Sequence, residues 1–529
     1  MPSRVLVSDT LAEAGLEILR QDPEIVVDSR PGLSPEELRK ILPSYHALIV
    51  RSATKVTADA IAVAENLRVI GRAGIGVDNV DVEAATRRGI VVMNTPGGNN
   101  VTTAEHAIAM LLALARNVAQ ATASVKQGKW ERNRFMGTEV CNKTLGILGL
   151  GNIGTIVAER ARGLRMRVIA FDPFLTSEGA AKLGVELVTL DDLYARSDFI
   201  TVHTPLTAET RRLIDARALK KMRRGVRIIN CARGGIVVEE DLAAAIRAGH
   251  VAGAALDVFA DEPPAADNPC IALDQVICTP HLGAQTDEAQ VNVAVAVAEQ
   301  VVAFLLRGVV QNAVNMPSLP PELLAVLRPY LRLAEKLGGL ESQLVPGHPE
   351  EIRIAYGGTV AEHDTTPLTA AVLRGFLAHF LDFPVNYVNA RHLAAERGIQ
   401  VVETRTRQPT GFVNSVGVQV RTATGTATVE GTVFGEDTLR IVNINGFHLE
   451  AVPEGYILML ENRDVPGVVG RVGTLLGSSN VNIARLELGR EHVGGKAVSL
   501  FHVDEPVPES VLEKLRAEPS ILSARLIRL

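Results

Sequence analysis

Six polar residues come just after short apolar runs, at positions where buried strands would end. The segments are ALIVR, RVIGR, ITVHT, RIINCAR, AALD and VICTPH, and the polar residues are Arg51, Arg72, Thr204, Arg233, Asp257 and His281. Ligands of open parallel sheets bind outside the carboxyl ends of the strands. We therefore expect these six side chains to gather at one such edge.

Three side chains of this region have the chemistry needed to oxidise a secondary alcohol. A histidine such as His281, with an ordinary pKa of about 6.5, can take the hydroxyl proton while hydride leaves for an acceptor. Glu262, in the segment FADEPP, could orient that ring and stabilise its protonated form. Arg233 could hold a carboxylate, or polarise a carbonyl, through paired hydrogen bonds.

The segment GLGNIG supplies the expected hydride acceptor. Its glycines, Gly149, Gly151 and Gly154, lie between the apolar run TLGIL and a helical pattern, and the next apolar run ends at Asp172. Such glycines permit a tight turn and a close approach to a pyrophosphate, while the acid accepts hydrogen bonds from the ribose. The alternative is that the glycines serve only helix packing. We predict NAD, because Asp172 would repel the 2′-phosphate of NADP.

Two series of alternating strands and helices surround these motifs. The first covers residues 4–95 and the second begins near residue 144, and a long helix is predicted over 101–127 and another over 291–308. Apolar strands alternating with amphipathic helices are typical of doubly wound parallel sheets. Prolines mark a linker near 316–321. An α+β segment follows, and the last residues show a βαββαβ pattern, which predicts a ferredoxin-like domain.

Composition narrows the class of protein. The chain has 529 residues, 47% of them hydrophobic, so three or more domains are expected. The net charge of −6, with basic residues spread along the chain, argues against nucleic acid and anionic membranes as partners. The start of the chain lacks a signal-like apolar region, which indicates a cytoplasmic protein. Neither a metal site nor a disulfide is predicted from the four cysteines, Cys141, Cys231, Cys270 and Cys278.

Five segments together resemble the D-isomer-specific 2-hydroxyacid dehydrogenases. They are GRAGIGVDNVD, GLGNIG, INCARGGIVVEEDL, ALDVFADEPP and TPHLGA, in the family's order over about residues 1–317. The resemblance implies that Arg233, Glu262 and His281 are the catalytic residues. It also implies an NAD site made by Gly149, Gly151, Asn152, Ile153, Gly154, Asp172, Thr204, Cys231, Ala232, Asp257, Gly283 and Ala284, with Asp257 on the nicotinamide amide.

Two further segments, LIVRSATKV and GKWERNRFMGTE, resemble long-form members of this family that act on a phosphorylated substrate. The resemblance implies oxidation of 3-phospho-D-glycerate to 3-phosphohydroxypyruvate, the first step of serine biosynthesis. Arg51, Arg72 and Arg132 would then neutralise the phosphate and the carboxylate, and Arg134 would assist. The alternative for Arg132 and Arg134 is a solvated, charged loop.

The C-terminal segment ENRDVPGVVGRVGTLLGSSNVNI resembles the amino-acid-binding loop and helix of ACT domains, which pair across subunits. This implies a homo-oligomer, either a dimer or a tetramer, with Asn462, Asp464 and Asn482 holding serine as a feedback effector. Asn462 departs from the family, which often has His or Tyr there. The segment before it resembles the intervening domain of long-form enzymes.

The expected domains are a substrate-binding domain (1–98 and 284–317), an NAD-binding domain (99–283), an intervening domain (318–453) and an ACT domain (454–529). Two other functions stay open at this point. One is a dehydrogenase for another 2-hydroxy acid, such as glyoxylate or hydroxypyruvate. The other is a non-catalytic, NAD-sensing regulator on the same fold, against which the complete catalytic set argues.

Overall fold

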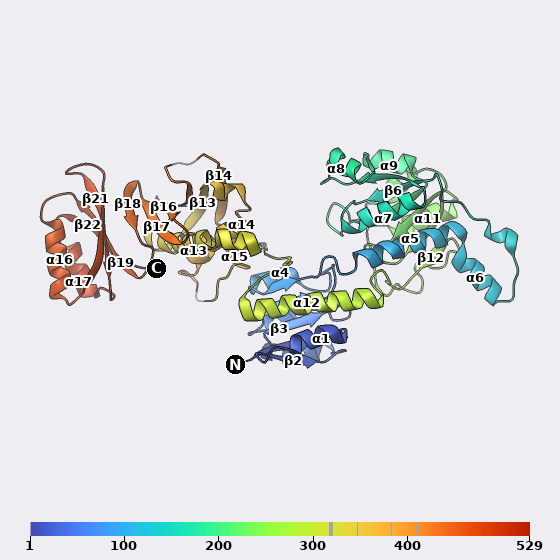
Figure 1. Cartoon of the computed structure of the whole chain (residues 1–529), viewed down its shortest axis with the longest axis horizontal. Coiled ribbons are helices and arrows are strands. Elements are labelled where there is room, and N and C mark those ends of the chain that lie inside the picture. Colours follow the sequence, from blue (N-terminus) through green and yellow to red (C-terminus); the bar gives the residue numbers. More distant parts are fainter. Residues whose placement is uncertain (1, 317–320, 346, 382, 409–410) are drawn as a thin grey trace.

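The computed structural model describes residues 2–316, 321–345, 347–381, 383–408 and 411–529, which form four sheets. Figure 1 shows the N-terminal sheet in the middle, the second sheet on one side, and the third and fourth sheets on the other. The predicted fold class is confirmed, because the first two sheets are parallel and the fourth has the ferredoxin-like order. The site described below lies between the first two sheets.

The N-terminal sheet has the order β2-β1-β3-β4-β5 and all its strands are parallel. Its strands are β1 (Ser3–Val7), β2 (Ile25–Ser29), β3 (Ala47–Val50), β4 (Val69–Arg72) and β5 (Val91–Met93). Its helices are α1 (Glu13–Arg20), α2 (Pro35–Ile41), α3 (Ala58–Ala62), α4 (Val82–Arg87) and, from much later in the chain, α12 (Asp287–Arg307).

Helix α12 is long and apolar enough to cross a membrane, yet it is a core helix here. Val293, Val297 and Val301 are buried in the hydrophobic core of the N-terminal sheet. Helix α1 approaches α12 closely at Gly15, where a Cβ atom would lie 2.6 Å from the carbonyl oxygen of Ala294. The apolar character of α12 is therefore explained by packing within the protein.

The second sheet has the order β12-β11-β10-β9-β6-β7-β8, again with parallel strands. Its strands are β6 (Thr144–Leu148), β7 (Arg167–Phe171), β8 (Glu186–Leu187), β9 (Phe199–Val202), β10 (Val226–Asn230), β11 (Val251–Leu256) and β12 (Val276–Cys278). The associated helices are α5 (Asn100–Arg116), α6 (Val118–Lys126), α7 (Asn152–Gly163), α8 (Ser177–Lys182), α9 (Leu190–Arg196), α10 (Ala216–Lys221) and α11 (Glu239–Arg247).

The single helix predicted over 101–127 is wrong, because the chain breaks at Asn117. Helices α5 and α6 are bent by 64° relative to each other. Asn117 has a φ of 51° and donates its backbone N–H to the carbonyl of Ala113. Asparagine is one of the few non-glycine residues that tolerate this left-handed conformation at a helix end. The bend directs α6 and the segment after it outward as an arm, residues 118–138 (Figure 1).

The third sheet is mixed, with the order β14-β13-β15-β16-β17-β18. Its strands are β13 (Pro349–Gly358), β14 (Gln400–Thr406), β15 (Asn414–Thr422), β16 (Gly425–Phe434), β17 (Thr438–Ile444) and β18 (Phe447–Ala451), and its helices are α13 (Pro321–Leu344), α14 (Thr366–Leu377) and α15 (Ala390–Glu396). The loop before α15 contacts the N-terminal sheet, where Val388 joins that sheet's core and Asn386 donates to the carbonyl of Gly89 at 2.8 Å.

The fourth sheet is antiparallel, with the order β20-β21-β19-β22. It comprises β19 (Tyr456–Arg463), α16 (Val468–Ser478), β20 (Ile483–Arg490), β21 (Lys496–Val503), α17 (Glu509–Arg516) and β22 (Ile521–Arg528). One face packs on α16 and α17, while Ile457, Met459 and Val498 on the other face join the core of the third sheet. The third and fourth sheets therefore share one hydrophobic core.

Replacing Glu341 with methionine is expected to stabilise this C-terminal part. The Glu341 side chain on α13 is fully buried, and neither carboxyl oxygen has a hydrogen-bond partner among the described residues. Burial raises the pKa of this carboxyl in the folded protein well above its usual range. As pH rises from the pKa of Glu341 in the unfolded chain to its pKa in the folded protein, ionisation favours unfolding, so Glu341 lowers the free energy of unfolding. We expect a gain of about 1–3 kcal/mol at pH 7.5.

Calorimetry at several pH values measures this effect as a higher melting temperature that depends less on pH. The control is Glu436→Met, at an exposed turn, which should leave the pH dependence unchanged. An unaltered pH dependence in Glu341→Met would contradict the prediction.

Candidate active site

A cleft of about 240 Å³ lies where the carboxyl ends of the strands from the first two sheets face each other. The sequence-predicted residues that line it are Arg72, Ile153, Thr204, Cys231, Ala232, Arg233, His281, Gly283 and Ala284. The structure thus brings together four of the six polar residues that follow apolar runs. Arg51 lies at the end of the neighbouring strand β3, and Asp257 lies beneath the cleft floor.

His281 and Glu262 form a hydrogen-bonded pair. The ring Nδ1 of His281 is 2.8 Å from Oε2 of Glu262, whose Oε1 accepts the backbone N–H of Phe259. This hydrogen bond raises the pKa of His281 above its ordinary value, against the opposing effect of burial. Burial is the largest single influence on Glu262 and would raise its pKa, but the hydrogen bond from His281, the charge of that ring and the backbone N–H of Phe259 together make the net shift downward. The pair is therefore a base whose protonated form is stabilised by a carboxylate.

A second histidine in the cleft, His203, differs from His281 in its electrostatics. Its Nδ1 is buried without a partner among the described residues, and its Nε2 lies 2.9 Å from the hydroxyl of Thr201. Burial lowers the pKa of His203 to about 4, so this ring stays neutral near pH 7. Of these two cleft histidines, only His281 is therefore placed to exchange protons near neutral pH.

Arg233 bridges the two sides of the cleft. Its Nε donates to Oδ2 of Asp78 at 3.0 Å and its Nη1 donates to the carbonyl of Ala232 at 2.7 Å. A Cβ atom at Gly76 would lie 1.9 Å from Nη2, so this glycine makes room for the guanidinium. Asp78 and Gly76 were not assigned from sequence, although both lie in the segment GRAGIGVDNVD, whose glycines were the available signal.

Arg72 is a partly buried cation with no counterion. Its Nη1 is 3.4 Å from the carbonyl of Ala73, its buried Nε has no partner, and no carboxylate of the described residues lies within ion-pair distance. Burial, and then repulsion by Arg233, lower the pKa of Arg72 to about 10. An unpaired cation in a cleft is suited to an anionic ligand. Gly74 has a φ of 148°, a backbone conformation that residues with a Cβ atom rarely adopt, and a Cβ atom there would also lie only 1.4 Å from Nη1 of Arg72.

Arg51 sits beside this site, and burial lowers its pKa as well. Its Nη1 donates to the carbonyl of Thr10 at 3.1 Å, and Asp9 accepts its backbone N–H at 2.6 Å. Arg51 is close enough to Arg72 to contribute to the lowered pKa of Arg72. Both positive charges thus lie on the N-terminal side of the cleft.

The glycine motif fits a dinucleotide. Gly149 has a φ of 89°, and a Cβ atom there would lie 2.7 Å from the carbonyl of His203; at Gly154 it would lie 2.1 Å from the carbonyl of Gly149. At Gly151, before α7, a Cβ atom would meet nothing within 4 Å, so this glycine leaves open space rather than serving packing. That space at a helix N-terminus suits a pyrophosphate, with Asn152 and Ile153 opening the helix.

The remaining predicted cofactor contacts flank this space. Asp172 follows β7, where its two oxygens accept the backbone N–H groups of Leu150 and Phe174, both at 2.9 Å. The hydroxyl of Thr204 is buried without a partner among the described residues, and so is free for a ligand. Cys231 is buried, and burial, together with Asp257, raises the pKa of its thiol.

Asp257 is engaged by the protein itself. It is fully buried, and its carboxylate accepts the hydroxyl of Thr279 and the backbone N–H groups of Leu282 and Gly283 at 2.7, 2.7 and 2.8 Å. The contact with a nicotinamide amide stays a prediction. The structure also shows that Asp257 holds the loop that carries His281, a role that the sequence did not predict.

Arg132 and Arg134 are not near this cleft in the same chain. Both lie on the arm, and Arg134 contacts Asp274 at 3.0 Å, just before β12 begins. In a parallel sheet that is the edge opposite the one carrying His281. Spacing along the sequence carries no information on distance in space, so it does not separate Arg132 and Arg134 from Arg51 and Arg72.

The three predicted effector residues do not meet within one chain either. Asn462 and Asp464 lie near the start of β21, where Asp464 accepts from Arg490 at 3.3 Å. Asn482 lies beyond the other end of β21 and donates to Asp504 at 2.7 Å. The eight residues of β21 separate the two groups by more than about 20 Å. A single effector can therefore contact all three only across two copies of the chain.

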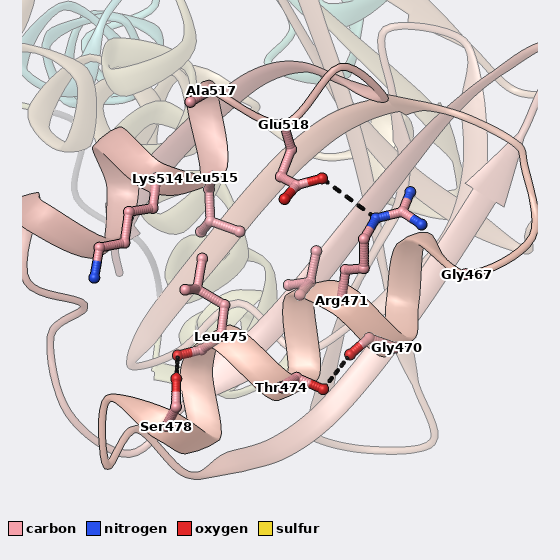
Figure 2. A pocket seen from close by; sticks show the side chains of 11 residues that line it. Gly467, Gly470, Arg471, Thr474, Leu475, Ser478, Lys514, Leu515, Ala517 and Glu518 are labelled. Carbon is pink, nitrogen blue, oxygen red and sulfur yellow. Dashed lines mark hydrogen bonds and ion pairs between the residues drawn. The ribbon is translucent and has the colours of Figure 1, made fainter.

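A different hollow lies between α16 and α17. Figure 2 shows Arg471 reaching across it to Glu518, a contact of 3.3 Å, with Thr474 and Ser478 on the α16 side. None of the three predicted effector residues lines this hollow.

Replacing Asp172 with asparagine is expected to weaken NAD binding and to ease NADP binding. Loss of one charge-assisted hydrogen bond should raise the KM for NAD about 10–100-fold, and loss of the negative charge should lower the KM for NADP. Steady-state rates with each cofactor measure the ratio. The exposed Glu178→Gln change on α8 is the control. An unchanged cofactor ratio would contradict the predicted role of Asp172.

Comparisons with known proteins agree with this geometry. The D-isomer specific 2-hydroxyacid dehydrogenase NAD binding domain model matches residues 108–283, the D-3-phosphoglycerate dehydrogenase intervening domain model matches 326–445, and the ACT domain model matches 456–520. D-3-phosphoglycerate dehydrogenase from Synechocystis sp. is 46% identical over 100% of this chain and 95% of its own. The enzyme of that name from Archaeoglobus fulgidus is 44% identical over 99% of this chain and 100% of its own.

A solved structure of a relative contains the predicted cofactor. NAD-dependent formate dehydrogenase from Staphylococcus aureus, in complex with NAD, superposes with a TM-score of 0.54 at 30% identity, covering 58% of this chain and 97% of its own. Together with the NAD binding domain model, it supports NAD as the cofactor.

Proposed function

Because the chain belongs to the D-3-phosphoglycerate dehydrogenase family, we propose that it oxidises 3-phospho-D-glycerate to 3-phosphohydroxypyruvate with NAD, the first step of serine biosynthesis. The observation that carries this conclusion is the identity of above 40% along the whole length of relatives with that name. The cleft agrees with it, since the unpaired Arg72 suits an anionic substrate.

Each side chain of the cleft then has a task. His281 takes the proton of the substrate hydroxyl, and Glu262 stabilises the resulting imidazolium. Arg233 anchors the carboxylate next to the reacting carbon, while Arg51 and Arg72 neutralise the substrate's negative charge. NAD, when bound, accepts the hydride. Gly149, Gly151 and Gly154 give its pyrophosphate room, Asp172 holds its ribose, and the other predicted contacts surround it.

NADH absorbance tests the activity directly. We expect NADH to form with 3-phospho-D-glycerate and to be consumed with 3-phosphohydroxypyruvate. Turnover with glyoxylate or hydroxypyruvate but with neither phosphorylated compound would favour another 2-hydroxy acid as substrate. NAD binding without turnover of any of them would favour a regulator.

The C-terminal part supports feedback control. Serine would bind between two ACT domains, held by Asn462 and Asp464 of one copy and Asn482 of another, which agrees with their separation within one chain. A serine titration of the NADH assay tests this, with Asn482→Ala expected to weaken inhibition. The domain boundaries at 98/99, 283/284, 317/318 and 453/454, and a cytoplasmic location, belong to the same proposal.

Changing Trp130 to serine is expected to reduce the size of the oligomer. Trp130 and Met136, on the arm, are 80% and 81% exposed, which is unusual for large apolar side chains and favours burial against a second copy. Arg132 and Arg134 would then reach the substrate of that copy. Light scattering after size exclusion measures the mass. Phe174→Ser, another exposed aromatic, is the control, and an unchanged mass in Trp130→Ser would contradict this role.

A further inference from the structure

The loop that carries His281 has an unfavourable backbone conformation. His281 has a φ of 54°, in the left-handed region that residues with a Cβ atom seldom adopt. Such a residue persists only where surrounding contacts hold it. The direction of the imidazole depends on this conformation, so the contacts that hold the loop also hold the base.

Asp257 provides most of these contacts from beneath. Its carbonyl oxygen accepts the backbone N–H of His281 at 3.0 Å. Its carboxylate accepts three more hydrogen bonds from the same loop, given above, which come from Thr279, Leu282 and Gly283. A fully buried carboxylate thus ties down residues on both sides of His281.

His106, on α5, is the side chain that meets this carboxylate from the other direction. Its Nε2 lies 3.2 Å from Oδ1 of Asp257 and 3.4 Å from the hydroxyl of Thr279. The contact with His106 is among the causes that lower the pKa of Asp257, although burial opposes them. His106 therefore contacts both the buried anchor and the loop, yet it does not line the cleft.

A metal ion is the other reading of this cluster, because ligand atoms of His106, Cys231 and Asp257 lie within 4.8 Å of one another. The donor set argues against it. Both oxygens of the Asp257 carboxylate already accept short hydrogen bonds from the protein, Oδ1 from Thr279 and Leu282 and Oδ2 from Gly283. A hydrogen bond from the imidazole N–H to the carboxylate fits these groups better.

We propose that His106 is a positioning residue for the catalytic pair. It donates its Nε2–H to Asp257 and so helps to hold the His281 loop in its left-handed conformation, with the imidazole directed at Glu262. This inference rests on the proposed dehydrogenase activity. It predicts that His106 affects the chemical step and the ionisation of His281 without contacting substrate or NAD.

The test compares His106→Phe, which removes the donor and keeps a ring, with His106→Gln, whose amide can still donate. In His106→Phe we expect kcat to fall about 10–100-fold, with little change in the KM for NAD, and the acid limb of the pH profile to move to lower pH. His106→Gln should recover most of kcat and the wild-type limb. Thr279→Val removes one hydrogen bond to Asp257. It should lower kcat and move the acid limb to lower pH, as His106→Phe does.

Three results would overturn the inference. The first is a His106→Phe enzyme with wild-type kcat and pH profile. The second is a failure of His106→Gln to recover kcat, while its melting temperature and NAD binding match the wild type. The third is a rise in wild-type activity on adding zinc after chelation, which would favour the metal. If His106→Phe is unfolded, Thr279→Val decides by the same readouts. An inactive wild type would instead contradict the proposed function.

Discussion

Replacing His281 with asparagine is expected to lower kcat about 100–10,000-fold while leaving NAD binding and the fold intact. Asparagine cannot act as a base but tolerates the left-handed backbone of this position, where φ is 54°. Alanine would remove the base and strain the loop together, so asparagine is the cleaner change. NADH formation at saturating substrate measures kcat, and a calorimetric titration measures NAD binding.

The pH profile adds a second readout. Oxidation needs His281 unprotonated, so the rate rises with pH through the pKa of this ring. Because the hydrogen bond to Glu262 raises that pKa, the acid limb should lie above the ordinary value of about 6.5. In Glu262→Gln the carboxylate charge is lost, and the limb should move to lower pH. A limb that stays in place would contradict the pairing, and a His281→Asn enzyme within tenfold of wild type would contradict the role of the base.

Strand ends were the part of the site most open to prediction from sequence. Arg72 ends an apolar run, and Thr204, Arg233 and His281 come two or three residues after the ends of buried strands. A buried parallel strand is apolar because both of its faces are covered. Since the carboxyl ends of these strands meet, the four residues line one cleft. The glycine motif was open to prediction for a related reason, because backbone geometry demands glycine at Gly149 and Gly154.

Features that depend on contacts remote in sequence were missed. Nothing in the helical pattern of 101–127 marks Asn117 as left-handed, because an asparagine inside a helix is only mildly unfavourable. The burial of Asp257 and its bonds to the loop depend on how β11 and β12 pack. The core shared by the third and fourth sheets was missed as well, although β21 is buried on both faces and reads as a nearly continuous apolar run.

Residues that could act only between copies of the chain form a separate group. Asn482 and the pair Asn462 and Asp464 were placed together by resemblance, and they lie at opposite ends of β21. Arg134 likewise lies on the arm and contacts Asp274, at the edge of the second sheet opposite the cleft that contains Arg72. Motif matching finds residues of one site without saying which chain supplies them. The reason is physical: the spacing of residues along one chain does not depend on which copy contributes each residue to a site shared between copies.

Replacing Arg72 with methionine is expected to separate binding from stability. The guanidinium is partly buried, lacks a counterion and is repelled by Arg233, and its pKa is lowered to about 10. Methionine keeps the length of the side chain and removes a charge that the free protein does not compensate. We therefore expect the melting temperature without substrate to stay equal or rise.

Catalysis should respond in the opposite direction. The substrate would lose a charge-assisted hydrogen bond in a poorly solvated cleft, so kcat/KM for 3-phospho-D-glycerate should fall about 100–1,000-fold. Arg233→Met serves as the comparison, because Arg233 is already paired with Asp78 and its loss leaves that carboxylate alone. Stabilisation of the wild type by 3-phospho-D-glycerate should disappear in Arg72→Met. A lower melting temperature of Arg72→Met, with kcat/KM unchanged, would contradict this prediction. It would show that the Arg72 side chain stabilises the fold and does not bind the substrate anion.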